Sequence, residues 1–223
     1  MLHRLSDGDE PVDGGSAGLS RQSEQKRQQI LMAAAGLFLR QGFEATTMDA
    51  IAREAGVSKA TVYAHARNKQ ELFAGIVSAR CLHVYQSVDA AAPGAASAED
   101  ALLRFARHFG QLILSPEARN IYRLVVAEAP RNPELGRIFY ENGPRVVQQR
   151  LAALLTAQCA AGRLAIDDPQ AAAQEFLGMV HGRFHLPCVL GVADQPGEEE
   201  LGRAVEHVVA TFLRAYRPAG GAR

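Results

Sequence analysis

Residues 46–69, TTMDAIAREAGVSKATVYAHARNK, constrain the fold more than any other stretch of the chain. Thr46 is a suitable N-cap for a short helix whose apolar residues recur on one stripe, and Gly56 fits the sharp turn that ends this helix. Ser58 then supplies the N-cap of a second helix over residues 59–65. Two short helices joined through a glycine corner predict a helix-turn-helix unit.

The spacing of Ala52, Gly56 and Val62 supports this interpretation. A small residue is needed where the two helices cross, and an apolar residue is needed to lock the second helix onto the first. The outward positions of the second helix are small or polar, which suits insertion into a major groove. A capping box at Asn68–Glu71 starts the next helix, and Lys69 in its first turn could hold a phosphate. Helical hairpins also occur in proteins that bind no DNA, so the fragment alone leaves both interpretations open.

Together with the preceding helix, this unit resembles the N-terminal domain of the TetR family of transcriptional regulators. The resemblance extends from Ile30 to Phe73. It rests on Ile30, Ala33, Ala34, Leu37, Phe38, Gly42, Phe43, Thr46, Thr47, Ile51, Ala52, Ala55, Gly56, Val57, Ser58, Thr61, Tyr63, His65, Lys69, Leu72 and Phe73. It implies a three-helix DNA-binding domain that contacts mostly phosphates and a few base edges.

The same resemblance implies which side chains face DNA. They are Thr47, Lys59, Thr61, Tyr63, His65 and Lys69. One position departs from the family pattern, because Ala66 stands where an aromatic residue usually follows the histidine. That aromatic normally helps to pack the recognition helix, so we expect Phe38, Phe43 or Phe73 to fill the space.

Charge is distributed unevenly along a chain whose formal net charge is zero. Residues 21–70 hold eight Lys and Arg against four acids, including all three lysines, whereas residues 1–20 hold one Arg and four acids. A modest cationic patch on a neutral body favours specific, salt-sensitive binding to an operator in double-stranded DNA.

The three cysteines, Cys81, Cys159 and Cys188, are widely spaced and odd in number, which argues against a disulfide framework. The sequence has no early apolar run of signal-peptide length and no apolar stretch long enough to span a membrane. These features predict a cytoplasmic protein without a membrane partner.

Helical periodicity dominates the rest of the chain, and no strand pattern is found. The sequence predicts an all-α fold: a mobile tail over 1–20, a DNA-binding domain over 21–68, and a ligand-binding and dimerisation domain of about nine helices over 69–223. Expected helices within it include a linking helix from Lys69 to about Ala90, a helix from Asp168 to about Leu190, and a last helix from Gly197 to Tyr216. Gly143–Pro144 should break a long helical stretch.

From about Ala101 to Gly191 the chain resembles the C-terminal domain class of AefR-like TetR repressors, through IYRLVVAEAPRNPELGRIFYENGP and IDDPQAAAQEFLGMVHGRFHLPCVLG. This resemblance implies a pocket for a small-molecule effector and a homodimer built by the last two helices. The apolar stripe of the final helix must be covered, which a partner subunit or internal packing could do.

Several residues from different helices could line such a pocket, although each could equally be ordinary core. They are Phe105, Phe109, Tyr122, Arg123, Phe139, Phe176, His181 and Phe184. The resulting hypothesis is a regulator, expected to be a repressor, that binds a palindromic operator as a dimer and is released by its effector.

Two alternatives stay open. His181, His185 and Cys188 would share one stripe of a continuous helix and could bind zinc or copper, giving a metal-responsive regulator, although such a stripe is more often core or interface. The departure at Ala66 also allows a helical small-molecule binding protein or enzyme with a vestigial DNA-binding unit. The chain carries no P-loop, no GxGxxG after a strand, no HExxH and no nucleophile elbow, so neither a cofactor nor catalysis is expected.

Overall fold

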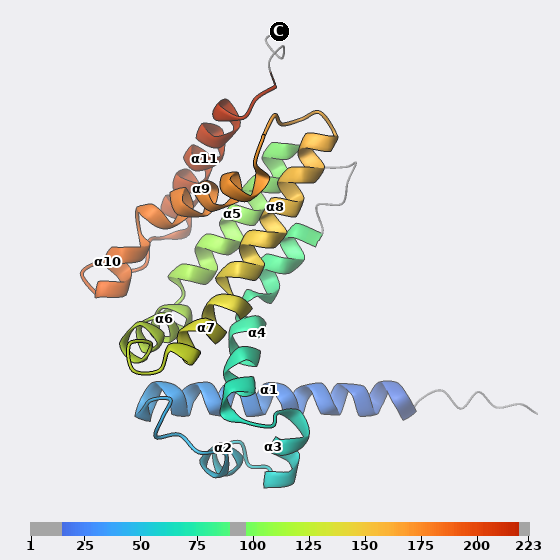
Figure 1. Ribbon diagram of the computed structural model, residues 1–223, viewed down its shortest axis with the longest axis vertical. Helices are drawn as coiled ribbons and strands as arrows, with labels where there is room; N and C mark the ends of the chain where they lie inside the picture. Colours follow the sequence, from blue (N-terminus) through green and yellow to red (C-terminus); the bar gives the residue numbers. More distant parts are fainter. Residues whose placement is uncertain (1–14, 90–96, 219–223) are drawn as a thin grey trace, which may run out of the picture.

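A computed structural model describes residues 15–89 and 97–218 of the chain. These residues form eleven helices and no strand, which confirms the all-α fold class. The helices are α1 (Gly15–Gln41), α2 (Met48–Glu54), α3 (Lys59–His65), α4 (Lys69–Asp89), α5 (Ala98–Leu114), α6 (Pro116–Glu128), α7 (Pro133–Asn142), α8 (Pro144–Ala160), α9 (Pro169–Gly182), α10 (His185–Leu190) and α11 (Glu198–Ala215). Figure 1 shows α1 to α3 at one end of an elongated molecule.

The helices after α3 number eight in the described residues, against about nine expected. Helix α1 begins at Gly15, so its first residues fall within the segment 1–20 that the sequence assigned to a tail, and residues 1–14 of that segment lie outside the described residues. No helix of the described ranges is long and apolar enough to cross a bilayer.

The N-cap of α2 is Thr47, so the expectation that Thr46 caps this helix is wrong by one residue. The Thr47 hydroxyl accepts the Ala50 N–H at 3.2 Å. Thr46 is buried instead, where its hydroxyl donates to the Gly42 carbonyl at 2.8 Å and accepts from the Gln41 amide at 3.1 Å. The Thr46 hydroxyl therefore stabilises the connection between α1 and α2, and it does not cap α2.

Three phenylalanines form the centre of the N-terminal unit, which comprises α1 to α3 and the start of α4. The Phe38 and Phe43 ring centroids lie 5.0 Å apart, and Phe73 of α4 meets them edge-on at 6.0 and 5.7 Å. All three rings are essentially inaccessible, and Ala66 is buried beside α3 as part of the same hydrophobic cluster. The three rings and Ala66 thus belong to one buried cluster, which joins α1, the α1–α2 connection, α3 and α4.

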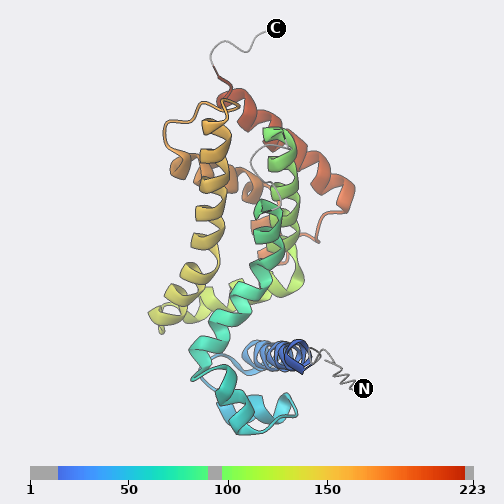
Figure 2. The same cartoon turned by 90° about the vertical axis from the view of Figure 1, so that its right-hand side faces the viewer.

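Helix α4 belongs to both parts of the molecule. Its first turns, with Phe73 and Ile76, pack in the cluster formed by α1 to α3. Its later residues Val84 and Tyr85 pack in the core of the larger part. Figure 2 shows this helix rising from the DNA-binding domain into the bundle. Helices α6 and α7 join the lower cluster through Ile121, Val125, Leu135 and Ile138.

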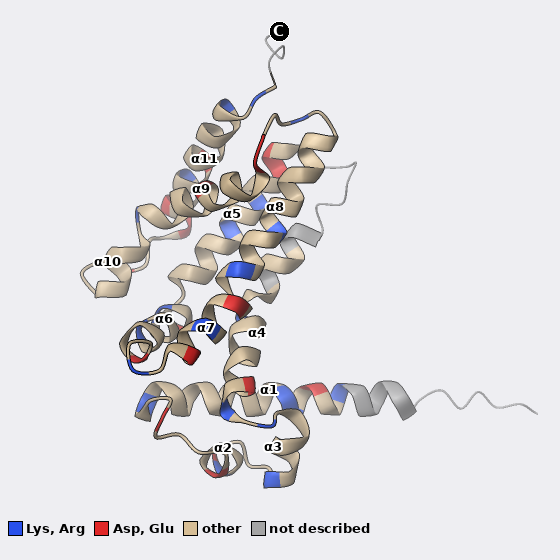
Figure 3. Cartoon of the chain, viewed as in Figure 1, with Lys and Arg blue, Asp and Glu red and all other residues tan. Residues whose placement is uncertain are grey.

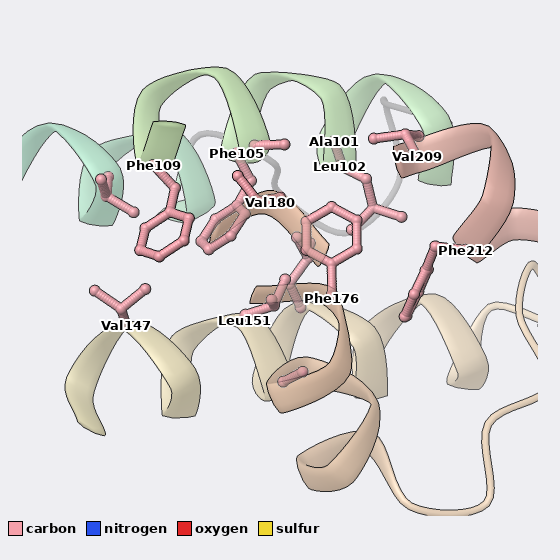
Figure 4. Packing of buried hydrophobic residues seen from close by; sticks show 14 of the residues in the cluster. Ala101, Leu102, Phe105, Phe109, Val147, Leu151, Phe176, Val180, Val209 and Phe212 are labelled. Atoms are coloured by element: carbon pink, nitrogen blue, oxygen red, sulfur yellow. The ribbon is translucent and has the colours of Figure 1, made fainter. Parts of the chain in front are cut away.

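The core of the larger part is formed by α4, α5, α8, α9 and α11. Phe105 of α5 meets Phe176 of α9 with 6.1 Å between ring centroids, and Phe176 meets Phe212 of α11 at 5.0 Å (Figure 4). Gly143 separates α7 from α8 at the expected break. A Cβ at Gly143 would lie 2.9 Å from Val77 Cγ1, so the absence of a side chain lets α4 approach this junction closely.

The segment expected as one helix from Asp168 to about Leu190 is divided in two, which corrects the prediction. Helix α9 ends at Gly182, and α10 starts at His185 after a short turn. Helical periodicity alone did not reveal the break, because apolar residues continue on both sides of it. The last helix spans Glu198–Ala215 and starts and stops within a residue of its expected bounds.

Replacing Phe38 by alanine should destabilise the protein by about 3–5 kcal/mol, because the change opens a cavity between two other rings. The measurement is urea unfolding followed by circular dichroism. Met32→Ala is the matched control on the same helix, because the Met32 side chain is 74% exposed. Equal stability losses in the two variants would contradict the role assigned to the ring cluster.

Candidate functional site

The outward face of α3 combines a fixed backbone with free side chains. Ser58 caps the helix by accepting the Thr61 N–H at 3.1 Å, and Val62 is fully buried against α1 and α2. Tyr63 projects outward with 51% of its surface exposed, and Ala64 beside it is also exposed. Helix α3 is therefore held through one face and offers the other to a partner.

The other residues expected to face DNA occupy varied positions. Lys59 is exposed and pairs with Asp49 of α2 at 2.5 Å, and Thr47 is exposed at the start of α2. The Thr61 hydroxyl lies 2.8 Å from that of Ser58, and His65 is half-buried at the end of α3. Figure 3 shows basic and acidic residues interspersed on α1 and a basic residue on α3. An exposed ion pair such as Lys59–Asp49 is weak, so the ammonium can exchange its partner for a phosphate.

Lys69 points into the protein. Its ammonium donates to the Phe43 and Glu44 carbonyls at 3.0 Å each and lies 4.6 Å from the centre of the Phe43 ring. Only 20% of its side chain is exposed. These contacts tie the start of α4 to the α1–α2 connection.

The start of α4 is capped from both sides. Asn68 accepts the Glu71 N–H at 2.8 Å, and the Glu71 carboxylate accepts the Arg67 N–H at 2.9 Å. The backbone hydrogen bond from Arg67 lowers the pKa of Glu71. The predicted capping box therefore forms, with Arg67 N–H in place of the Asn68 N–H as the second donor.

The larger part contains a cavity of about 250 Å³. Residues from α4 to α10 line it: Val77, Arg80, Cys81, Phe109, Leu112, Ile113, Ala118, Ile121, Tyr122, Phe139, Gly143, Pro144, Val147, Leu177, Gly178, His181 and His185. Most of these side chains are apolar. An apolar enclosure with a few polar groups is the usual form of a small-molecule site.

Four of the eight residues expected to bind a ligand line this cavity: Phe109, Tyr122, Phe139 and His181. Phe105 and Phe176 lie in the core instead, with no accessible surface. Phe184 lines a separate hollow between α9 and α11. Arg123 is exposed and donates to the Val189 and Cys188 carbonyls at 2.6 and 3.0 Å.

The sequence did not indicate the α4 contribution to the cavity, Val77 and Cys81, because apolar periodicity does not show which helix faces enclose a space. His185 was considered only as a metal ligand. The break between α9 and α10 turns its ring onto that of His181, with 4.2 Å between ring centroids and 16° between planes.

Aromatic rings form much of the cavity wall. The Phe109 ring stacks on His181 at 5.8 Å and 12°, which extends the His181–His185 stack. Tyr122 meets His185 edge-on at 5.0 Å and Phe139 at 6.3 Å. The wall thus contains three nearly parallel rings, those of Phe109, His181 and His185. The Tyr122 ring lies edge-on to His185, and the Phe139 ring lies edge-on to Tyr122.

Burial keeps the two histidines neutral near pH 7. It lowers the pKa of His181, and it lowers that of His185 to about 4, where the neighbouring His181 and Arg119 also disfavour a positive charge. No group of three His, Cys, Asp or Glu residues suited to a metal ion exists in the described ranges. The Cys188 thiol donates to the Asp194 carbonyl at 3.3 Å. The two imidazoles therefore stack on each other and the Cys188 thiol bonds to a carbonyl, whereas a single continuous helix would have aligned all three as metal ligands.

Comparison with known families gives two matches. The family model described as bacterial regulatory proteins of the tetR family matches residues 30–76. The model of the AefR-like transcriptional repressor C-terminal domain matches residues 100–218, which is more than half of the chain. Together they include all of α2, α3 and α6 to α11, and α5 except its first two residues.

Solved structures agree over nearly the whole chain. A putative TetR-family transcriptional regulator from Mesorhizobium loti superposes with a TM-score of 0.73 at 28% identity, covering 88% of this chain and 99% of the other. The flavonoid-responsive regulator FrrA has a TM-score of 0.69 at 38% identity, covering 88% and 100%.

Among curated sequences, the HTH-type transcriptional activator FasR of Mycolicibacterium smegmatis is 37% identical over 67 residues, or 30% of this chain and 31% of FasR. The matched region thus spans about a third of the length of this relative. The exposed face of α3, the helical architecture and the two family models lead to one conclusion: the chain belongs to the TetR family, with an AefR-like C-terminal domain, and is a DNA-binding transcriptional regulator.

Proposed function

We propose that this regulator is a ligand-responsive repressor, not an enzyme, that acts in the cytoplasm, binds a palindromic operator as a homodimer and leaves it when a small molecule occupies the cavity. The observation that carries the proposal is the position of Val77. This residue of α4 lines the cavity and also belongs to the hydrophobic cluster of the DNA-binding domain. The same side chain, Val77, therefore bounds the cavity and packs against the DNA-binding unit.

On the DNA side, we propose that α3 enters the major groove. Tyr63 and Thr61 would contact base edges and phosphates, while Lys59, Thr47 and His65 would contact the backbone. Two such helices in a symmetric dimer would lie about 34–36 Å apart, one turn of DNA, which requires a palindromic site.

On the effector side, ligand binding must favour one arrangement of α4 over another, because coupling is limited by differential affinity for the two states. Val77 and Cys81 present α4 directly to the cavity. A ligand that displaces them would shift the helix whose first turn packs against Phe38 and Phe43, and so alter the spacing of the two α3 helices.

For the dimer, the resemblance implies an interface of the last two expected helices, which correspond to α9 with α10 and to α11. The hollow between them is lined by Met179, Phe184, Leu201 and Val208. Leu186 and Leu190 of α10 add exposed apolar surface nearby, at 62% and 65%. Exposed apolar side chains beside an open hollow favour coverage by a second subunit.

Repression is supported by the name of the matched C-terminal family, whereas FasR is described as an activator. A reporter gene placed behind the operator decides between them. Higher reporter expression when the regulator gene is deleted supports repression, and lower expression supports activation.

Lys59→Ala and Tyr63→Ala should each weaken operator binding by roughly 5- to 100-fold, as expected for the loss of one phosphate or base contact. The measurement is fluorescence anisotropy with DNA flanking the regulator's own gene, at two salt concentrations, with scrambled DNA as the control. Lys59→Ala should also reduce the dependence of affinity on salt.

The matched variant is Arg145→Ala, which removes an exposed positive charge from α8, far along the chain from the DNA-binding unit. It should bind like the wild type. Unchanged affinity in Lys59→Ala and Tyr63→Ala would refute the assignment of the α3 face.

Lys69→Ala should lower stability as well as operator affinity, because the variant loses the hydrogen bonds from the ammonium to the Phe43 and Glu44 carbonyls. The expected loss is about 1–3 kcal/mol in urea unfolding. Lys59→Ala, which removes only an exposed ion pair, should unfold like the wild type. A Lys69→Ala protein of wild-type stability would show that the internal contacts contribute nothing.

Ala118→Phe should abolish release from the operator by an effector while leaving operator binding intact, because a larger side chain at this half-buried position would occupy the cavity. Ala127→Phe is the control, since Ala127 is exposed on the same helix and outside the cavity. The assay is anisotropy of the operator complex with flavones as test compounds, chosen because FrrA is named flavonoid-responsive. Equal responses in both variants would exclude the cavity as the effector site.

A further inference from the structure

Few of the side chains that line the cavity are polar, and they differ in charge and exposure. Arg80 is exposed to solvent, and burial raises the pKa of the Cys81 thiol, which therefore stays neutral. The remaining polar side chains are Tyr122, His181 and His185. The lining includes no carboxylate, so an organic cation would find no charged partner there.

These three side chains carry hydrogen-bonding groups that are not paired within the described residues. Within the described residues, no hydrogen bond uses the Tyr122 hydroxyl or a ring nitrogen of His181 or His185. Nor do these atoms count among the fully buried ones without a partner, which are His108 Nδ1 and Arg119 Nε. They therefore keep some accessible surface, and the three residues that carry them line the cavity. A neutral imidazole offers one donor and one acceptor, and a phenol offers both.

Helix α10, which carries His185, is tied to α6 by hydrogen bonds from two arginines. Arg119 donates to the Cys188 carbonyl at 3.1 Å, and Arg123 donates to the Cys188 and Val189 carbonyls. Both arginines belong to α6, so α6 holds the last carbonyls of α10, where the helix dipole favours a cation. These bonds tie α10 to α6, and the His185 ring at the other end of α10 packs against His181 and Tyr122.

Ring geometry indicates the shape of the ligand. The nearly parallel rings of Phe109, His181 and His185 and the crossing Tyr122 ring all line the cavity, so a ligand there meets aromatic surface. Offset-stacked and edge-to-face contacts are the favourable arrangements between aromatic rings. A flat, rigid ring system would meet these faces at low entropic cost.

We infer that the cavity selects an uncharged planar aromatic compound bearing hydroxyl groups, and that His181, His185 and Tyr122 determine this selectivity by hydrogen bonding to those hydroxyls. The inference rests on the proposed function, because it names the effector class of the same site. The apolar lining accepts the ring system. The two imidazoles and the phenol distinguish a hydroxylated ring system from its bare parent.

The test compares hydroxyflavones with unsubstituted flavone by isothermal titration calorimetry on the full chain. The wild type should bind the best hydroxyflavone roughly tenfold more tightly than flavone, since one or two hydrogen bonds are added. His181→Phe and His185→Phe preserve a flat ring but remove its nitrogens, and Tyr122→Phe removes the hydroxyl. Each should lose most of the preference for hydroxyflavone while binding flavone within about threefold of the wild type.

Tyr140→Phe is the matched control, because Tyr140 is exposed on α7 and lies outside the cavity. Thermal unfolding by circular dichroism establishes that each variant is folded, and a variant that fails to fold is replaced by the leucine variant at the same position, which also lacks a hydrogen-bonding group. Wild-type binding that is equal for both compounds, or absent for both, overturns the inference. So does full preference retained in all three variants.

Operator release is measured separately with the same compounds. Selective binding without release supports the ligand class and contradicts the effector role proposed for the cavity. Release by compounds that bind without dependence on His181, His185 or Tyr122 supports the regulator and contradicts the ligand class.

Discussion

The close approach of α4 to the α7–α8 junction is the contact on which the rest of the architecture depends. Val77 packs where Gly143 has no side chain, and a Cβ there would lie within 2.9 Å of Val77 Cγ1. Both residues line the cavity, and Val77 also packs with the DNA-binding helices. Because protein interiors are close-packed, a change of volume at this contact cannot be absorbed without movement of one of its neighbours.

Helix α6 divides its surface in a comparable way. Ile121 and Val125 pack in the cluster of the DNA-binding domain, Ala118 and Tyr122 face the cavity, and Arg119 and Arg123 hold α10. Residues three and four apart share a helix face, so one helix of this length can serve three neighbours at once. Helices α4 and α6, together with α7, thus connect the cavity with the helix-turn-helix unit. Such shared helices are the physical elements through which binding at one site can bias another.

The two histidines illustrate how a fold changes the meaning of a motif. On a continuous helix, His181, His185 and Cys188 would form a stripe of three ligands for a metal ion. In the structure the chain turns after Gly182, the imidazoles stack, and the thiol donates to a backbone carbonyl. Burial lowers the pKa of both rings, and Arg119 lowers that of His185 further, so both favour the neutral form.

The sequence by itself determined the helical class, the helix-turn-helix unit and the family. These features depend on local signals: Ser58 as a cap, Gly56 in a turn, and apolar residues at helical spacing. It also pointed to Phe109, Tyr122, Phe139 and His181, which line the cavity. Only the tertiary structure separated them from Phe105 and Phe176, which are equally apolar but fully buried. The tertiary structure also turned Lys69 inward and brought Val77 and His185 to the cavity. Helical periodicity indicates that a residue faces away from water. It does not indicate whether that residue meets a packed core or a cavity.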